Sequence, residues 1–250
     1  MTRVAIFALA LSAFGADFKD VNRTVALHGN GTVEIETHKG SIRVSVWDRQ
    51  EVEIQARIEA EPGEIMDRRR FDATEVRIDS SPDAVRMKTY YPDFNWCCGS
   101  DNGNNPEVRY TVRMPKTAQL TIKDHRSDIE VSGVEGTLNL NTYRGSAHVR
   151  GLGGALHLDT YRGDVDVEFS SFAAGGSVKS YRGTVALSMP KSSHFDLDTN
   201  LGRHGAVDTD FSVMMRTVRR SGEAMHGTVN GGGPSLRIET YRGEIRVHGR

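Results

Sequence analysis

The stretch NLNTYRGSAHVRGLGGALHLDTYRGDVDVEF, residues 139–169, contains the tetrapeptide TYRG twice, at Thr142–Gly145 and at Thr160–Gly163. The tetrapeptide returns as SYRG at Ser180–Gly183 and as TYRG at Thr240–Gly243. A motif that recurs can be a binding site used several times, or one structural unit built several times. Which of the two applies here bears on both the fold and the function.

The spacing of the motif indicates a structural repeat. The first three motif tyrosines recur at nearly equal intervals, and His125 stands one interval before Tyr143. Asn200 stands one interval after Tyr181, and Tyr241 follows Asn200 by two intervals with a small excess. A period of about 19 residues is typical of a solenoid, whose units bury their apolar faces only by stacking on one another.

Apolar and polar residues alternate on both sides of each motif. Leu156, Leu158 and Thr160 lead into the second motif, and Val165 and Val167 leave it. Alternation with period two predicts strands that bury one face. Glycine supplies the backbone freedom of a corner, and we assign that role to five glycines: Gly40, Gly145, Gly163, Gly183 and Gly243. Two strands and two corners in each period predict an all-β fold, a flattened parallel β-solenoid with coils of roughly 18–20 residues.

The chain before the repeats follows the same theme less regularly. The segment GTVEIETHKGSIRVSVWD, residues 31–48, contains the same corner with His38 and Lys39 in place of Tyr-Arg. Longer alternating segments follow, for which we expect some antiparallel pairing, and one helix is predicted over Pro62–Phe71. We divide the chain into an irregular β region at 16–115 and solenoid repeats at 116–250, with an insertion at 208–227.

The N-terminus has the features of an export signal. Arg3 precedes an apolar run from Val4 to Phe14, and small residues follow at Ala13 and Gly15. We predict a signal peptide over residues 1–15, with cleavage after Gly15 or after Ala16. The apolar run is shorter than the roughly 20 residues of a membrane-spanning helix, and no later segment could span a membrane. The protein is therefore expected to be periplasmic, cell-surface or secreted.

The two cysteines are adjacent, Cys97 and Cys98. Neighbouring Cα atoms lie about 3.8 Å apart, so a bond between these cysteines would be a strained vicinal disulfide. The alternatives are two free thiols or pairing with another chain. An oxidising compartment favours the vicinal disulfide, and the absence of C-x-x-C spacing argues against redox catalysis.

Several segments, in this order, resemble a bacterial family of adhesin-type β-strand-repeat proteins. They are GSIRVSVWD at 40–48, YTVRMPKTAQLTIKDHRSDIEVSGVEG at 110–136, LSMPKSSHFDLDTNLGRHGAV at 187–207 and NGGGPSLRIETYRGEIRV at 230–247. The resemblance implies a right-handed β-solenoid and an extracytoplasmic location. This chain departs from the family pattern at its corners, where a small or branched residue and Ser usually precede the Gly and where Tyr-Arg stands here.

Stacked corners would place equivalent side chains in columns at about the 4.8 Å spacing of neighbouring strands. Two interpretations of these columns are open. The rings and guanidinium groups could merely pack on one another, through cation–π contacts. Alternatively they form an aromatic and cationic strip that binds an acidic glycan or another extended polyanion, because a guanidinium fork matches carboxylate or phosphate. The candidate ligand-binding residues are Tyr143, Arg144, Tyr161, Arg162, Tyr181, Arg182, Tyr241 and Arg242.

Nearby carboxylates could instead neutralise the arginine column, with Asp159, Asp164 and Glu244 as candidates. Acidic residues also suggest a polysaccharide lyase or hydrolase, since glycoside cleavage uses paired carboxylates. The residues concerned are Asp159, Asp164, Asp166, Glu168, Asp196 and Asp198. Charged residues alternating with apolar ones are, however, the expected solvent face of any strand.

Other classes of site have less support. His148 and His157 could be neighbours across a coil, but two ligands without a third make a weak metal site. The formal net charge of −1 argues against a nucleic-acid-binding protein. We therefore predict no catalytic residue, no metal site and no cofactor.

The sequence favours an exported, non-catalytic binding or scaffold protein of the cell envelope. Its expected partner is an acidic polysaccharide, held by repeated weak contacts along the Tyr-Arg columns, or a cell-envelope protein. The alternatives are a polysaccharide-cleaving β-solenoid enzyme and an envelope stress or assembly partner that docks through an exposed coil edge.

Overall fold

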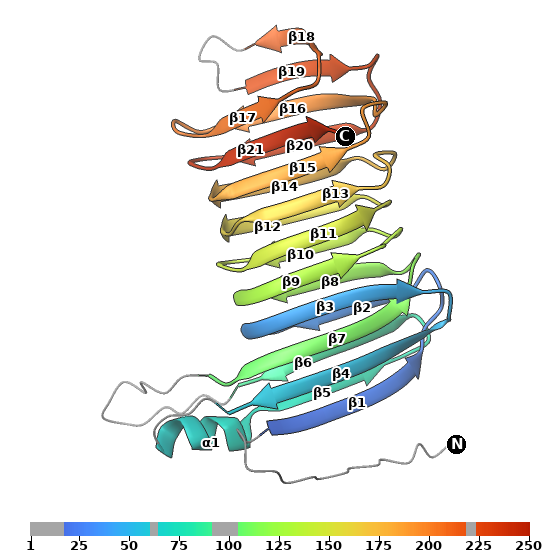
Figure 1. Ribbon diagram of the computed structural model, residues 1–250, viewed down its shortest axis with the longest axis vertical. Coiled ribbons are helices and arrows are strands. Elements are labelled where there is room, and N and C mark those ends of the chain that lie inside the picture. Colours follow the sequence, from blue (N-terminus) through green and yellow to red (C-terminus); the bar gives the residue numbers. More distant parts are fainter. Residues whose placement is uncertain (1–17, 61–64, 92–104, 219–223) are drawn as a thin grey trace.

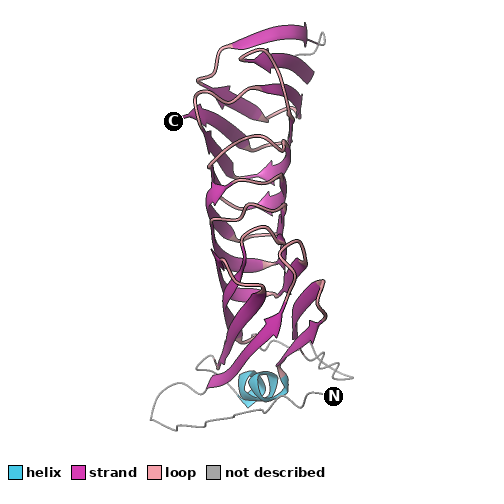
Figure 2. Ribbon diagram, turned by 90° about the vertical axis from the view of Figure 1, so that its right-hand side faces the viewer, coloured by secondary structure: helices cyan, strands magenta, loops and turns pink. Residues whose placement is uncertain are grey.

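A computed structural model describes residues 18–60, 65–91, 105–218 and 224–250. The predicted signal peptide at 1–15 and the cysteine pair Cys97 and Cys98 lie outside the described residues. The predicted all-β fold is confirmed, and the described residues contain one helix, α1 (Ile65–Ala73), close to the expected position. The strands form an elongated stack (Figure 1), and Figure 2 shows its two sheets edge-on as facing walls joined by loops.

Sheet A has ten strands in the described chain. In spatial order they are β1 (Phe18–Ala26), β4 (Glu51–Glu59), β7 (Glu107–Pro115), β3 (Lys39–Trp47), β9 (Arg126–Ser132), β11 (Ser146–Leu152), β13 (Val165–Phe169), β15 (Thr184–Met189), β21 (Glu244–Gly249) and β17 (Ala206–Thr209).

Sheet B has eleven strands in the described chain. In spatial order they are β18 (Val213–Val218), β19 (Ala224–Val229), β16 (Phe195–Leu201), β20 (Ser235–Thr240), β14 (Gly176–Arg182), β12 (Leu156–Arg162), β10 (Leu138–Thr142), β8 (Gln119–Asp124), β2 (Thr32–Glu36), β6 (Ala84–Tyr90) and β5 (Glu75–Ser80).

The middle of each sheet is parallel and in register with the repeat. Leu140 of β10 pairs with Ile122 of β8 and with Leu158 of β12, and Val149 of β11 pairs with Val131 of β9. Alternate residues of both sheets point between the two layers, where most are almost fully buried. The period of the sequence therefore becomes columns of equivalent apolar side chains, one from each coil.

Antiparallel pairing is found where it is expected, before the repeats, but the expectation of a parallel solenoid after them needs a correction, because both sheets are mixed. Pairing is antiparallel between β1 and β4, β4 and β7, and β5 and β6 at one end. It is antiparallel again between β16, β19 and β18 at the other end, within and beside the predicted insertion. A hairpin can fold back directly on its neighbour, so a short segment suffices to cover the last coil.

The C-terminal coil occupies an unexpected place in the stack. Strand β20 lies between β14 and β16, and β21 lies between β15 and β17, all in parallel pairing. The sequence period placed Tyr241 two coils beyond Asn200, which is wrong. After β15 the chain skips the next layer and forms β16 to β19 beyond it, and β20 and β21 then fill the skipped layer. The chain returns to this layer through the turn at 230–234, where Asn230, Gly231 and Gly232 have positive φ.

Candidate functional site

Two of the TYRG corners are closed by a hydrogen bond to their first residue. The Thr142 hydroxyl accepts a hydrogen bond from the Gly145 N–H at 3.1 Å, and Thr240 does the same for Gly243 at 3.0 Å. In the earlier corner, a carboxylate oxygen of Asp124 accepts the N–H of Ser127 at 2.8 Å. These first residues are buried. The two residues that follow are therefore carried outward, to the edge where sheets A and B meet.

The corner glycines are required mainly by close packing between coils. A Cβ atom on Gly163 would lie 2.2 Å from the carbonyl oxygen of Gly145, and one on Gly183 would lie 2.3 Å from that of Gly163. Of the five corner glycines, Gly40 and Gly183 have positive φ, at 131° and 112°. The expected reason, backbone freedom, therefore applies to those two, whereas lack of space applies along the whole corner.

Six rings stack along this edge and form what we call the aromatic column. Successive ring centroids are 4.4–5.3 Å apart, and the interplanar angles are between 3° and 20°. Because each inner ring has a neighbour on both faces, only its edge and polar atoms remain accessible. The column consists, in order, of His38, His125, Tyr143, Tyr161, Tyr181 and Tyr241.

The tyrosine hydroxyls of the aromatic column are unpartnered in the described part of the chain. Within the described residues, no hydrogen bond is made by the hydroxyl of Tyr143, Tyr161, Tyr181 or Tyr241. The first three rings are half-buried, as expected for rings that expose only their edges. The column therefore presents phenolic hydroxyls, which both donate and accept hydrogen bonds, at the spacing of the coils.

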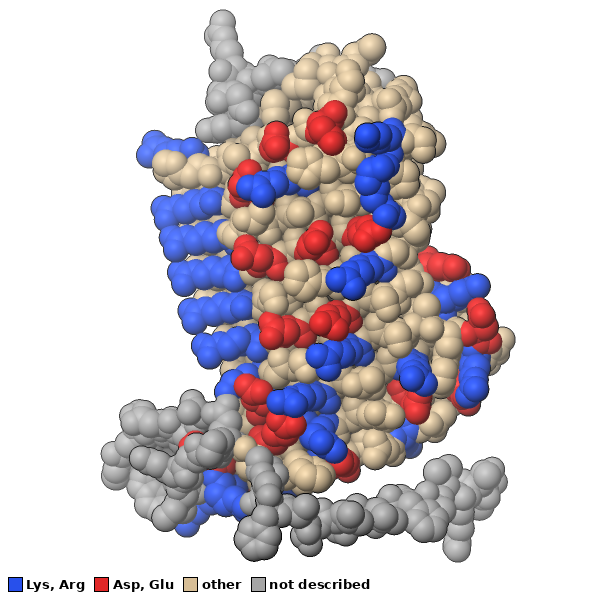
Figure 3. All heavy atoms as spheres, viewed as in Figure 1, with Lys and Arg blue, Asp and Glu red and all other residues tan. Residues whose placement is uncertain are grey.

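A second column of positive charge runs beside the rings, and we call it the basic column. Each motif arginine holds its guanidinium carbon 5.2–5.7 Å from the centroid of its own tyrosine ring. Figure 3 shows the result as a row of Lys and Arg side chains projecting along one edge of the molecule. The column consists of Lys39, Arg126, Arg144, Arg162, Arg182 and Arg242, the first two paired in register across β3 and β9.

The arginines of the basic column have no acidic partner in the described chain. Among the described residues, no carboxylate forms an ion pair with Arg126, Arg144, Arg162, Arg182 or Arg242. Two of the carboxylates considered as neutralising partners are engaged elsewhere. Asp164 accepts the N–H of Thr184 at 3.0 Å, and Glu244 binds Arg246 at 2.9 Å.

Two titratable groups at the corner are affected by their surroundings. The pKa of His38 lies below its usual value, chiefly because of burial, with further contributions from the positive charges of His125, Arg126 and Lys39. Burial raises the pKa of Asp124, and this outweighs the hydrogen bonds that it accepts from Ser127 and Thr142. At the His end of the column, burial thus shifts the pKa of each group in the direction that disfavours its charged form.

Sequence reasoning missed part of this edge. The site residues it named begin at Tyr143, whereas the columns extend through His125 and Arg126 to His38 and Lys39. The signal was present, since HRS and HKG occupy the positions of YRG in the earlier coils. The pattern predicts corners at these positions, and the stacking of the rings adds them to the strip.

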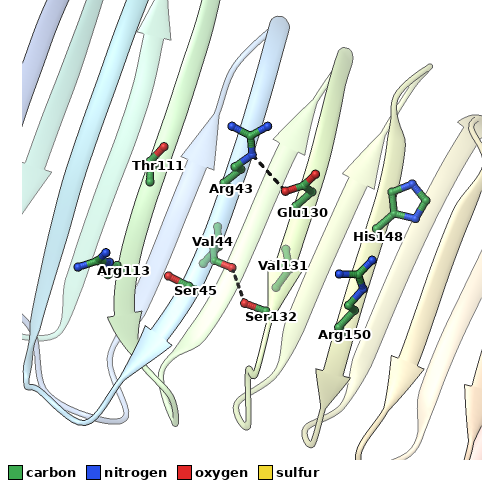
Figure 4. A pocket seen from close by; sticks show the side chains of 10 residues that line it. All are labelled: Arg43, Val44, Ser45, Thr111, Arg113, Glu130, Val131, Ser132, His148 and Arg150. Carbon is green, nitrogen blue, oxygen red and sulfur yellow. Dashed lines mark hydrogen bonds and ion pairs between the residues drawn. The ribbon is translucent and has the colours of Figure 1, made fainter.

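The surface of sheet A also has a shallow hollow, drawn in Figure 4. Arg43 binds Glu130 at 3.1 Å across it, and Arg113 and Arg150 lie on its sides. Their three guanidinium groups do not converge on one point. The hollow therefore lacks the geometry of a discrete anion site.

The structure separates residues that a metal site or an active site would need together. His148 lies on β11 of sheet A and His157 on β12 of sheet B, and the described residues contain no group of three or more metal-ligating side chains placed to hold an ion. The candidate catalytic acids are also divided, with Asp159 on sheet B and Asp166 on sheet A. Glu168 is paired with Arg250.

Comparisons with known proteins concern the fold. A family model described as Toastrack DUF4097 matches residues 110–248, which is more than half of the chain. No curated protein matches. Within the described residues, no helix is long and apolar enough to cross a membrane.

Two solved structures align with this chain over most of its length. One is a "putative cell adhesion protein" from Clostridium sporogenes, 10% identical over 93% of this chain and 100% of that chain, with a TM-score of 0.47. The other is a "putative adhesin" from Bacteroides fragilis, 11% identical over 93% of this chain and 97% of that chain, with a TM-score of 0.32.

Proposed function

The chain belongs to the Toastrack DUF4097 family, and from this premise we propose that it is an exported, non-catalytic binding protein of the cell envelope. Its proposed ligand is an extended acidic polysaccharide that lies along the basic column. Export is supported by the signal-peptide pattern at residues 1–15.

The observation that carries the proposal is the row of arginines without acidic partners among the described residues. The tyrosine rings beside these arginines repeat every 4.7–5.3 Å. The positive charges of neighbouring coils are therefore held close together along the edge. Two unit charges about 4 Å apart repel by about 1 kcal/mol even in bulk water. A polyanion relieves this repulsion in every coil at once, and repeated weak contacts on one chain reinforce each other.

The aromatic column favours a polysaccharide over a single-stranded nucleic acid. Proteins that bind single strands without sequence preference stack bases on open aromatic faces. Here the faces of Tyr143, Tyr161 and Tyr181 are covered by neighbouring rings. Their hydroxyls suit the hydroxyl and carboxylate groups of a uronic acid polymer, because a phenol donates and accepts hydrogen bonds.

The positions and partners of the acidic residues near the repeats favour binding over cleavage of a polysaccharide. Glycoside hydrolysis places two carboxyl groups on either side of one bond. The acidic residues near the repeats lie on two different sheets, and Asp164, Glu168 and Asp198 are engaged with Thr184, Arg250 and His226. Carboxylates that are separated and already paired are poorly placed for catalysis, which supports a binding role for the protein.

The test compares two variants with the same change in charge. The column variant carries Arg144→Gln, Arg162→Gln, Arg182→Gln and Arg242→Gln. The face variant carries Arg109→Gln, Arg113→Gln, Arg150→Gln and Arg246→Gln, all on sheet A. Binding of polygalacturonate is measured by calorimetry over a range of NaCl concentrations, with neutral dextran as the control ligand and circular dichroism as the check on folding.

We expect the wild type and the face variant to bind polygalacturonate in a salt-sensitive way, and the column variant to bind about tenfold or more weakly. Dextran should not bind. Equal weakening in both variants, or no binding by the folded wild type, would contradict the proposed ligand. The chain length of the polymer should not change on incubation, and shortening would contradict the non-catalytic assignment.

A further inference from the structure

The two ends of the aromatic column differ. At the His end, Tyr91 packs edge-on against His38, with ring centroids 5.9 Å apart and an angle of 69°. The Tyr91 hydroxyl is fixed there by Thr37 at 3.3 Å. At the other end Tyr241 is 45% exposed, and it is the one tyrosine of the column that ranks among the exposed large hydrophobic residues of the described chain.

The aromatic column ends at Tyr241 because the equivalent position in the next coil is occupied by a glycine, which has no side chain. Leu201 of β16 pairs with Thr240 of β20, so the next residue, Gly202, stands where earlier coils have a ring. Sequence spacing had put Asn200 in that position, which is wrong by two positions. A Cβ atom on Gly202 would lie 2.5 Å from Cδ2 of Tyr241, so any side chain there would press on the ring.

Polar groups surround this open end. A groove beside the corner is lined by Tyr161, Tyr181 and Tyr241, by Gly202 and Arg203 of the next turn, and by a row of polar side chains from sheet B. The row runs across neighbouring strands in register, and it consists of Asp159, Lys179, Glu239 and Asn200. Lys179 binds Glu239 at 3.1 Å, while Asp159 and Asn200 make no side-chain hydrogen bond or ion pair within the described residues.

We propose that the open end of the aromatic column is a sugar-binding subsite, in which one pyranose ring of the acidic polysaccharide lies on Tyr241. This inference rests on the proposed function, and it adds the place where a sugar ring is held. An exposed aromatic ring offers an apolar face with a polar rim, which matches the C–H face and hydroxyl rim of a pyranose.

The neighbouring groups complete the match. Asn200 and Arg203 belong to the coil next to Tyr241. The amide of Asn200 can donate hydrogen bonds to sugar hydroxyls and accept them, and Arg203 can bind a carboxylate. Because the opposite end of the column is closed by Tyr91, the subsite exists at one end of the strip. A bound glycan would therefore have a fixed direction along the basic column.

The test uses a short ligand, tetragalacturonate, and compares the wild type with Tyr241→Ala and Tyr241→Phe. Saturation-transfer NMR reports which sugar C–H protons contact the protein, and the ring current of a stacked tyrosine moves those protons upfield. Gly202→Ala is the second variant, because its methyl group would press on the ring of Tyr241 while every arginine of the basic column is kept. Binding of polygalacturonate by the same proteins is measured in parallel.

We expect saturation and upfield shifts at the protons of one sugar in the wild type and in Tyr241→Phe. Both signals should be lost in Tyr241→Ala and in Gly202→Ala, with tetragalacturonate affinity reduced several-fold. If Tyr241→Ala fails to fold, the comparison of Gly202→Ala with the wild type decides the matter. Unchanged sugar signals in the folded variants would overturn the subsite while the polymer still binds the basic column. Absence of polymer binding by the wild type would overturn the proposed function as well.

Discussion

The ring of Tyr241 stacks on the ring of Tyr181, with centroids 5.3 Å apart and an interplanar angle of 10°, although strands β15 to β20 separate the two along the chain. The contact exists because β20 pairs directly with β14. The C-terminal coil is therefore an internal layer of the stack, and its Tyr241 is the exposed end of the aromatic column.

This internal position makes the C-terminal coil important for stability. Ile238 is 0% exposed and lies between β14 and β16. We expect Ile238→Ala to lower the free energy of unfolding by about 2–5 kcal/mol, as for other large-to-small core substitutions. Met214→Ala is the control, since Met214 is 74% exposed and its loss should change stability by less than about 0.5 kcal/mol. Urea unfolding followed by circular dichroism measures both, and similar losses in the two variants would refute an internal position for β20.

The close approach of neighbouring corners gives a second prediction. Gly163→Ala would bring its new Cβ within 2.2 Å of the Gly145 carbonyl oxygen, and we expect a destabilisation of about 1–3 kcal/mol, typical of overpacking. Gly153→Ala is the matched control, because its nearest atom would be the Ser170 Oγ at 3.4 Å, an ordinary contact. If thermal unfolding shows both variants to be equally stable, the corners are looser than the structure indicates.

The sequence allowed the corners and the apolar layers to be predicted, because both depend on residues a fixed distance apart. Tyr143, Tyr161 and Tyr181 belong to consecutive coils, and counting along the chain was enough to align them. The same counting misplaces Tyr241, because the chain skips one layer after β15 and fills it only with β20 and β21. Spacing along the sequence does not show which strands pair in space. It also could not reveal that the arginines lack acidic partners among the described residues, because that depends on where Asp164 and Glu244 find their own partners.

The hydroxyls that close the corners offer a third prediction, because two equivalent threonines differ. The Thr142 hydroxyl accepts the Gly145 N–H, whereas the Thr160 hydroxyl is buried with no hydrogen-bond partner in the described chain. Thr142→Val should destabilise the protein by about 1–3 kcal/mol, because it leaves a buried N–H unsatisfied. Thr160→Val should be neutral or slightly stabilising. Chemical denaturation distinguishes them, and a larger loss for Thr160→Val would contradict the hydrogen-bond assignment.

The lowered pKa of His38 predicts a dependence of stability on pH. The folded state favours the neutral imidazole, so below the ordinary pKa of 6.5 the unfolded chain binds the proton more readily. Stability from this source is present above that value and is lost as the pH falls through the lower pKa of the folded state. His38→Phe keeps a ring in the column and cannot titrate. Between about pH 7.5 and pH 5.5, we expect the urea midpoint of the wild type to fall further than that of the variant. Parallel curves would show that His38 does not contribute.

The tyrosines of the aromatic column give a final prediction, which separates the role of the ring from that of the hydroxyl. The hydroxyls of Tyr143, Tyr161 and Tyr181 make no hydrogen bond within the described residues, so replacing all three by Phe should leave the free energy of unfolding within about 0.5 kcal/mol. Replacing Tyr161 alone by Ala removes two ring contacts, each worth about 0.5–1.5 kcal/mol beyond its buried area, and should destabilise the protein clearly. The triple Phe variant should nevertheless bind polygalacturonate several-fold more weakly, because the ligand loses hydroxyl partners while the basic column is intact. Full binding by that variant would assign the tyrosines a purely structural role and leave the arginines alone as the contact surface.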